Sequence, residues 1–202
     1  MAQRRHHYDR AFERFLRERR IPYISVDEAR KALLPEGARL GVSDGARLRA
    51  IKSFDFVIYT PQGNVIVDVK GRRCPARVAG GAGRARLESW VTREDIESMA
   101  LWETLLGPRF RAAFVFLYWC EVQPADALFQ EVFEDRGRWY AVRTVELEPY
   151  RAHMRIRSHR WGTVHLGAED FERLSEPFVR VRSPSRDGEN FRLDSAPAPG
   201  VR

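Results

Sequence analysis

The 202-residue chain lacks the features that mark several classes of protein. Its two cysteines, Cys74 and Cys120, have neither CxxC spacing nor histidines at zinc-ligand intervals, so we expect no disulfide framework and no structural zinc site. The longest apolar run, at 112–120, is about half the length that a membrane-spanning helix needs. The amino-terminal segment is charged and amphipathic, unlike a signal peptide. We therefore expect a cytoplasmic protein without a membrane-bound part.

Lysine is nearly absent as well. The 35 basic residues comprise 32 arginines and 3 lysines, which are Lys31, Lys52 and Lys70. The formal net charge of +7 favours an anionic partner such as nucleic acid. A GC-rich genome would also produce such an excess of arginine, so charge alone leaves this partner open. Because lysine is rare, each lysine that is present becomes more informative.

The order of the predicted elements is typical of a mixed α/β (α+β) domain with a small central mixed sheet flanked by helices. We expect a single domain over 1–182, with its core at about 6–120, a hairpin and helix extension at 121–182 and a disordered tail at 183–202. Periodicity and turn residues predict helices at 6–20, 27–34, 92–107 and 168–178, a loop at 35–48, a first hairpin at 53–70, a buried strand at 110–120 and a second hairpin at 129–147.

The most strand-like segment, IKSFDFVIYTPQGNVIVDVKGRR at 51–73, carries Asp55, Asp68 and Lys70 within its apolar runs. Two runs of β-branched and aromatic residues flank the turn-forming TPQG, which predicts a hairpin. Side chains alternate along a strand, so Asp68 and Lys70 share a face. If residues 61–64 form the loop, Asp55 lies opposite Lys70 and diagonal to Asp68.

Two chemical interpretations fit these charges. Neighbouring carboxylates repel each other unless a cation neutralises them, and Mg²⁺, for which Mn²⁺ can substitute, prefers oxygen ligands and keeps several waters. One of those waters can become a nucleophile, and a lysine can orient it or stabilise the charge that develops on a phosphate. The other interpretation is an ordinary salt bridge on an amphipathic hairpin. The pattern indicates phosphodiester hydrolysis without excluding the salt bridge.

FDF at the start of one strand and VDVK at the end of the next resemble the PD-(D/E)xK nuclease superfamily, which includes restriction endonucleases and archaeal-type Holliday junction resolvases. The resemblance covers about 6–120 and implies a restriction-endonuclease-like core, with an acidic helix before the hairpin and a helix and strand after it. HYDRAFE at 7–13 is similar to an uncharacterised bacterial family named for a His-Tyr-Glu-x-Ala-Phe-Glu (HYExAFE) signature. Asp9 stands in place of the first Glu of that signature.

The resemblance also implies site residues. Asp55 corresponds to the metal-binding aspartate, Asp68 to the acidic residue that shares the metal, and Lys70 to the catalytic lysine. Glu13 corresponds to the helix acid that binds or positions the metal through water. Helical spacing by itself predicts a solvated ion pair between Glu13 and Arg17 instead. No proline precedes Asp55, and the helix after Lys70 offers no clear glutamine or second lysine, so the subfamily stays open.

A basic loop is predicted directly after Lys70, over 71–89. Mobile cations next to a nuclease site suit contacts with backbone phosphates, although a simple flexible insertion would look the same. The arginines that we expect to bind nucleic acid are Arg72, Arg73, Arg77, Arg84 and Arg86.

Three functions are compatible with these patterns. The first is a Mg²⁺-dependent nuclease that acts on DNA, with Asp55, Asp68, Glu13 and Lys70 as its site. The second is a nucleic-acid binder without catalysis on the same scaffold, and the third is a structural or interaction domain whose arginine excess is only compositional. The substrate's structure and the oligomeric state stay open, with a homodimer among the alternatives.

Overall fold

The computed structural model of the protein describes residues 3–27, 41–44, 47–61, 63–74, 87–123 and 131–178. The predicted helix over 27–34 lies outside these residues from 28 onward, and so does the predicted disordered tail over 183–202. No helix in the described ranges is long and apolar enough to cross a membrane.

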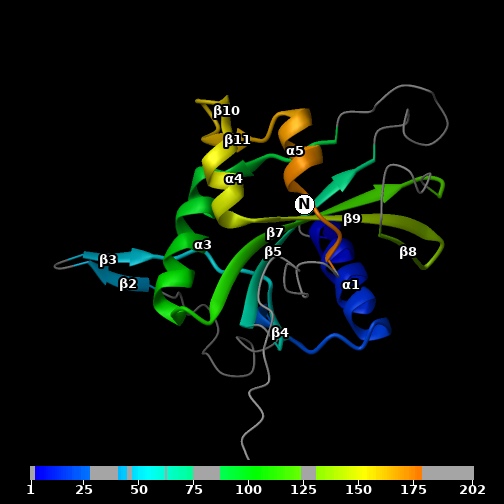
Figure 1. Cartoon of the computed structure of the whole chain (residues 1–202), viewed down its shortest axis with the longest axis horizontal. Helices are drawn as coiled ribbons and strands as arrows, with labels where there is room; N and C mark the ends of the chain where they lie inside the picture. Colours follow the sequence, from blue (N-terminus) through cyan, green and yellow to red (C-terminus); the bar gives the residue numbers. More distant parts are fainter. Residues whose placement is uncertain are drawn as a thin grey trace, which may run out of the picture.

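A six-stranded mixed sheet forms the centre of the fold (Figure 1), with the order β1-β4-β5-β7-β9-β8. Strands β5 and β7 are parallel, and every other neighbouring pair is antiparallel. The strands are β1 (Tyr23–Ser25), β4 (Phe56–Thr60), β5 (Gly63–Arg73), β7 (Phe110–Cys120), β8 (Val132–Asp135) and β9 (Arg138–Glu146). The predicted mixed α+β class, with a central sheet flanked by helices, is confirmed.

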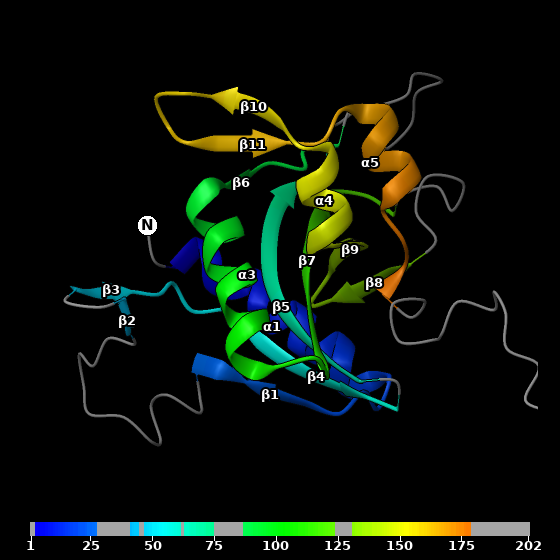
Figure 2. The same ribbon diagram turned by 60° about the vertical axis from the view of Figure 1, so that its left-hand side comes forward.

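Helices cover both faces of this sheet. Helix α1 (Gln3–Glu18) packs on one face, where Phe12 and Phe15 meet the side chains of β4, β5 and β8. Figure 2 shows the remaining helices on the opposite side. These are α3 (Arg93–Leu106), α4 (Leu147–His153) and α5 (Ala168–Leu174). The order of α1, β4, β5, α3 and β7 is the one that the resemblance implies.

Strand β7 is the buried centre of the sheet, as its nearly continuous apolar sequence predicts. Its residues from Ala112 to Tyr118 are at most 1% exposed. Both faces of a strand in this position are covered by helices, so neither face can be polar. Strand β5 lies directly beside β7 and is covered by the same helices, so charged groups on β5 such as Asp68 are also buried.

A second, three-stranded antiparallel sheet with the order β10-β11-β6 lies beyond the main sheet. Its strands are β10 (Arg155–Ser158), β11 (Thr163–His165) and β6 (Val91–Thr92). Strand β6 leads directly into α3, so the small sheet is connected to the start of that helix. A two-stranded hairpin is formed by β2 (Gly41–Asp44) and β3 (Arg47–Ala50). The prediction that 35–48 is entirely loop was therefore wrong, because the short strands are too polar to show a clear apolar alternation.

The hairpin β4–β5 forms as predicted, but its register differs by two residues. Thr60 pairs with Gly63 and Phe56 pairs with Val67, so the loop holds two residues instead of four. The paired register ends at Phe56 and Val67, and the N–H of Asp55 donates to the carbonyl of Val67, so Asp55 does not lie opposite Lys70 as predicted. A shift of two residues preserves the alternation of side chains, whereas a shift of one would have reversed it.

Helix α1 approaches β5 closely at Gly71. A Cβ at this position would lie 2.1 Å from Cδ2 of Tyr8, inside the aromatic ring. The Tyr8 hydroxyl also donates a hydrogen bond to the carbonyl of Arg72, at 3.0 Å. Gly71 therefore lets α1 pack against β5 immediately after Lys70.

Candidate active site

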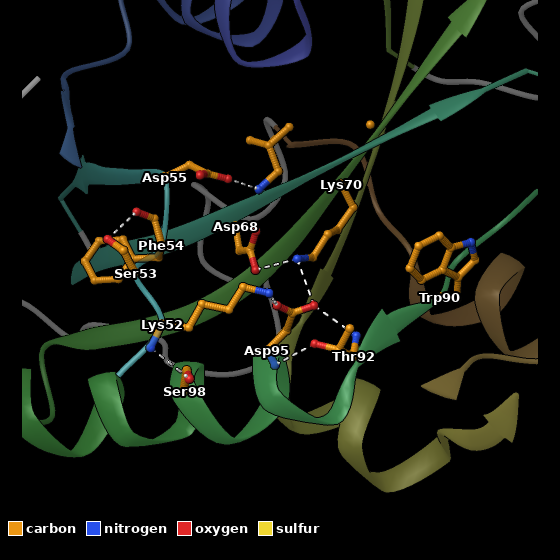
Figure 3. Close-up of polar contacts among 12 residues, drawn as sticks. Lys52, Ser53, Phe54, Asp55, Asp68, Lys70, Trp90, Thr92, Asp95 and Ser98 are labelled. Carbon is orange, nitrogen blue, oxygen red and sulfur yellow. Dashed lines mark hydrogen bonds and ion pairs between the residues drawn. The ribbon is translucent and has the colours of Figure 1, made fainter. Parts of the chain in front are cut away.

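Asp55 occupies the point where the β4–β5 ladder stops. Its backbone N–H donates to the carbonyl of Val67, at 2.9 Å, and its carboxylate Oδ2 accepts from the N–H of Val69, at 2.6 Å. The backbone of β5 beyond Val67 is thus capped on this side by a side chain, where a further residue of β4 would otherwise pair. This bond fixes the Asp55 carboxylate beside β5 at Val69, the residue between Asp68 and Lys70 (Figure 3).

Asp68 and Lys70 lie on the same face of β5, as their spacing predicts. The Lys70 ammonium Nζ is 2.8 Å from Oδ2 of Asp68, and the two side chains are only 14% and 10% exposed. The predicted salt bridge therefore exists, and it is buried. A buried ion pair costs desolvation energy, so it is weak evidence that the pair is there for stability alone.

A third carboxylate, Asp95, completes this cluster. Its Oδ2 lies 3.0 Å from Nζ of Lys70, and its Oδ1 forms an ion pair with Lys52. Asp95 is 3% exposed and belongs to a capping box at the start of α3, in which it accepts from the N–H of Thr92 and donates its own N–H to the Thr92 hydroxyl (Figure 3). Thr92 is thus the N-cap of α3.

Sequence reasoning missed Asp95 and Lys52 as members of this cluster. Two signals were available: the rarity of lysine, which marked Lys52, and the Thr-x-x-Asp spacing of a capping box at 92–95. Neither signal shows that the two residues meet, because 43 positions separate them. Helix α3 brings them together, since Trp102 donates to the carbonyl of Lys52 at 3.0 Å and Ser98 accepts from its N–H at 3.3 Å.

The environment of the two hairpin aspartates disfavours the ionised form of each carboxyl group. Burial raises the pKa of Asp55 well above its usual value, and the charges of Asp68 and Asp9 raise it further. Burial also raises the pKa of Asp68, although the ammonium of Lys70 opposes this. Two carboxylates that disfavour ionisation next to each other form the kind of place where a cation is stabilised.

The other two members of the cluster hold their charges firmly. Burial by itself would lower the pKa of Lys70, but Asp68 and Asp95 outweigh it, and the pKa of Lys70 is raised. Burial opposes ionisation of Asp95, yet Lys70 and Lys52 lower the pKa of this carboxyl strongly. Lys70 is therefore a permanent cation at neutral pH.

Glu13 does not join the hairpin aspartates. Its Oε1 accepts from Arg17 at 2.6 Å and from the hydroxyl of Tyr23 at 2.8 Å, which is the ion pair that helical spacing predicts. The acidic residue of α1 that acts electrostatically on Asp55 is instead Asp9, one helical turn earlier. Asp9 occupies the position where the family signature has its first Glu.

Only part of the predicted basic loop at 71–89 lies in the described residues, and its first residues are strand. Arg72 and Arg73 belong to β5, and the positions of Arg77, Arg84 and Arg86 lie outside the described residues. Arg72 turns inward, where burial lowers its pKa and its guanidinium carbon lies 3.9 Å from the ring centroid of Trp90. Arg73 is exposed and forms an ion pair with Glu121.

The donor set suits a hard cation with few protein ligands. Within the described ranges, no group of three or more histidine, cysteine, aspartate or glutamate side chains is gathered closely enough to hold a metal ion. Asp55 and Asp68 offer two carboxylates. Mg²⁺ commonly binds through one or two carboxylates and completes its shell with water and substrate phosphates. The residues present therefore fit Mg²⁺, but not a cation that needs a complete protein cage.

No family model and no curated protein matches this chain. Among solved structures it is similar to Hjc of Archaeoglobus fulgidus, a Holliday junction resolvase from an archaeal hyperthermophile. The two chains are 10% identical, the alignment covers 87% of this chain and 93% of that one, and the TM-score is 0.43. A likeness at this level concerns the fold and says nothing of the reaction. Membership of the HYExAFE family stays a prediction.

Proposed function

We propose that the protein is a metal-dependent nuclease that hydrolyses phosphodiester bonds in DNA. The observation that supports this is the position of the Asp55 carboxylate, which accepts from the N–H of Val69 between Asp68 and Lys70, while Lys70 pairs with Asp68 on one face of β5. The pKa of Asp55 is raised by burial and then by the charge of Asp68, and a bound cation would stabilise the ionised forms of both carboxylates.

Asp55 and Asp68 would hold the metal, and Mg²⁺ or Mn²⁺ would supply an acidified water and a counter-charge for the phosphate. Lys70 would act as a fixed cation. Because its pKa is raised, it is a poor proton acceptor, so its role is to stabilise negative charge on the phosphate or to orient the attacking water. Asp95 would be a positioning residue, since its Oδ2 lies 3.0 Å from Nζ of Lys70 and holds this ammonium together with Asp68.

The test is cleavage of labelled DNA by the full chain with Mg²⁺, with Mn²⁺ and with EDTA. The substrates are a duplex, a four-way junction and a single strand, because the site does not discriminate between them. We expect cutting that requires the metal and that is lost in Lys70→Ala and Asp68→Asn. Asp170→Asn, which neutralises a carboxylate in an exposed ion pair with Arg155, is the matched control and should cut like the wild type.

Folding of each variant is checked by circular dichroism and by its melting temperature. Cutting by Lys70→Ala at the wild-type rate on all three substrates would refute the assignment of Lys70. Cutting that persists in EDTA, or equally in all variants, would indicate a contaminating nuclease. The Glu13→Gln variant separates the two acids of α1: we expect it to cut normally, whereas Asp9→Asn should alter the rate through Asp55.

One observation favours the second candidate, a nucleic-acid binder without catalysis. Lys70 is already paired with both Asp68 and Asp95, so these charges satisfy one another within the protein. This function predicts salt-dependent DNA affinity, no turnover with any metal, and no calorimetric Mg²⁺ site in the presence of DNA. The absence of any DNA complex at low salt would point instead to a structural or interaction domain.

A further inference from the structure

A cavity of about 380 Å³ lies between the segment 87–90 and the small three-stranded sheet. Its walls are residues 87–90, Arg157 of β10, His165 of β11 and the adjacent Leu166. The volume is within the range of about 300–1,000 Å³ that is usual for ligand pockets. Neither the candidate metal site nor the catalytic lysine contributes to its walls.

The wall formed by 87–90 is rigidly attached to the core. Ser89 is 3% exposed and exchanges hydrogen bonds with the backbone of Leu166, both at 3.2 Å. The Tyr150 hydroxyl donates to the carbonyl of Ser89 at 2.7 Å, and the Tyr118 hydroxyl donates to that of Glu88 at 2.8 Å. A segment without regular secondary structure is therefore held in place from inside, which is what a preformed binding surface requires.

Trp90 lines the cavity, and the guanidinium groups of Arg72 and Arg157 lie over its ring. Arg72 packs on the ring at 3.9 Å from its centroid and also donates to the carbonyl of Trp90, so the ring is supported from the side of β5. Arg157 lies farther away, at 5.1 Å, and its side chain is 42% exposed. An indole supported on one side, with a movable cation nearby, is the arrangement on which nucleobases stack.

Glu88 decides between a base and a free phosphate. Its Oε1 accepts from Arg157 at 3.2 Å and its Oε2 accepts from the indole N–H of Trp90 at 3.3 Å. A carboxylate on the cavity wall repels a phosphate, but it accepts hydrogen bonds from the exocyclic amino group of a base. The chemistry of the wall therefore favours a nucleobase with an amino group, with its phosphate outside the cavity near Arg157.

The cavity is close to the candidate site along β5. Lys70 and Arg72 are two residues apart on the same face, which is about 7 Å along a strand, and Arg72 contacts Trp90. Strand β6 follows Trp90 directly and ends at Thr92, which caps the helix that carries Asp95 (Figure 3). A nucleic-acid strand whose phosphate lies at Lys70 therefore passes beside the cavity.

We infer that this cavity binds one unpaired, amino-bearing nucleobase of the substrate strand, stacked on Trp90 and hydrogen-bonded to Glu88. The inference rests on the proposed action on nucleic acid, and it adds that the substrate has an unpaired or extruded base next to the reacting phosphate. It also gives the small sheet a role in binding that the hairpin alone does not provide.

The test measures binding without cleavage, in EDTA, with single-stranded oligonucleotides that carry one 2-aminopurine. Stacking on an aromatic ring quenches the fluorescence of this base, and its amino group suits Glu88. We expect quenching on binding to the wild type, and a loss of affinity of about 5- to 150-fold in Trp90→Leu. Trp90→Phe, which keeps a ring, should retain most of the quenching.

Arg157→Ala and Arg160→Ala form the matched pair. Both remove one positive charge from the small sheet region, but Arg160 does not line the cavity and instead lies over the ring of Trp161. We expect both variants to weaken binding through the lost charge, and only Arg157→Ala to reduce the quenching at saturating protein. Glu88→Gln should reduce the preference for cytosine over thymine in mononucleotide competition.

Equal quenching in the wild type, Trp90→Leu and Arg157→Ala would overturn the inference. Trp90→Phe, which keeps a ring, and Arg157→Ala, whose side chain is 42% exposed, distinguish loss of the base site from unfolding. The two proposals fail separately. Quenching that depends on Trp90 without metal-dependent cutting would leave the base site intact and refute catalysis. Cutting that depends on Lys70, with quenching that does not change in Trp90→Leu, would support catalysis and refute the base site.

Discussion

Replacing Asp95 by Asn removes the charge on which the buried cluster depends while preserving the size of the side chain. The carboxylate lies 3.0 Å from Nζ of Lys70, whose side chain is only 14% exposed. Removing one partner from a buried ion pair typically costs about 3–5 kcal/mol, because the remaining charge stays buried with less compensation; here Lys70 keeps Asp68, at 2.8 Å, and loses Asp95. Lys52 also contacts Asp95, but its side chain is 37% exposed, so solvent screens that pair and we add nothing for it.

This loss is large compared with the free energy of unfolding of a whole domain, about 5–15 kcal/mol. In a protein of this size each kcal/mol shifts the melting temperature by about 2–4 °C, so Asp95→Asn should melt about 6–20 °C lower than the wild type. The measurement is urea unfolding and thermal melting at pH 7 in EDTA. Asp170→Asn, which affects partners that are mostly exposed, should cost far less.

The pH dependence follows from the lowered pKa of Asp95. A carboxyl whose pKa is depressed in the folded protein stabilises it above the unfolded pKa of about 3.9, and this contribution is lost as the pH falls toward the folded pKa. The difference between wild type and Asp95→Asn should thus be complete at pH 7 and shrink below about pH 4. Adding Lys70→Met should recover part of the loss. Equal stabilities of Asp95→Asn and Asp170→Asn at pH 7 would refute this reasoning.

Further outcomes are expected around the hairpin. Because the pKa of Asp55 is raised in the folded state, stability falls as the pH rises from the unfolded pKa of about 3.9 to the folded pKa. Asp55→Asn should therefore raise the melting temperature in EDTA at pH 8 and leave it unchanged near pH 3, and a lower melting temperature at pH 8 would contradict this. Because a ligand carboxylate must be ionised, calorimetric Mg²⁺ affinity should rise with pH as Asp55 loses its proton, and a flat profile would argue against Asp55 as a ligand. Gly71→Ala should cost about 1–3 kcal/mol in urea unfolding by displacing Tyr8, with a smaller added loss in the Tyr8→Ala background; strictly additive losses would disprove the clash.

Local patterns predicted much of this fold from sequence. The apolar run at 110–120 became the buried strand β7, and Thr92 became the N-cap of α3. Alternation placed Asp68 and Lys70 on one face, and their ion pair follows directly from that spacing. These features depend on residues that are neighbours in the chain, so periodicity and capping chemistry were enough to find them.

Tertiary structure decided which groups meet across the chain. The two-residue loop set the register of the hairpin, which ends where the Asp55 carboxylate accepts from the N–H of Val69, and the packing of α3 against residues 51–54 brought Lys52 and Asp95 together. The orientation of α1 on the sheet lets the charge of Asp9 act on Asp55, whereas Glu13 forms an ion pair with Arg17. Sequence by itself determined that charged groups would stand in an apolar hairpin. Their partners depended on loop length and layer packing, because a residue's spacing specifies its face but not what is folded against that face.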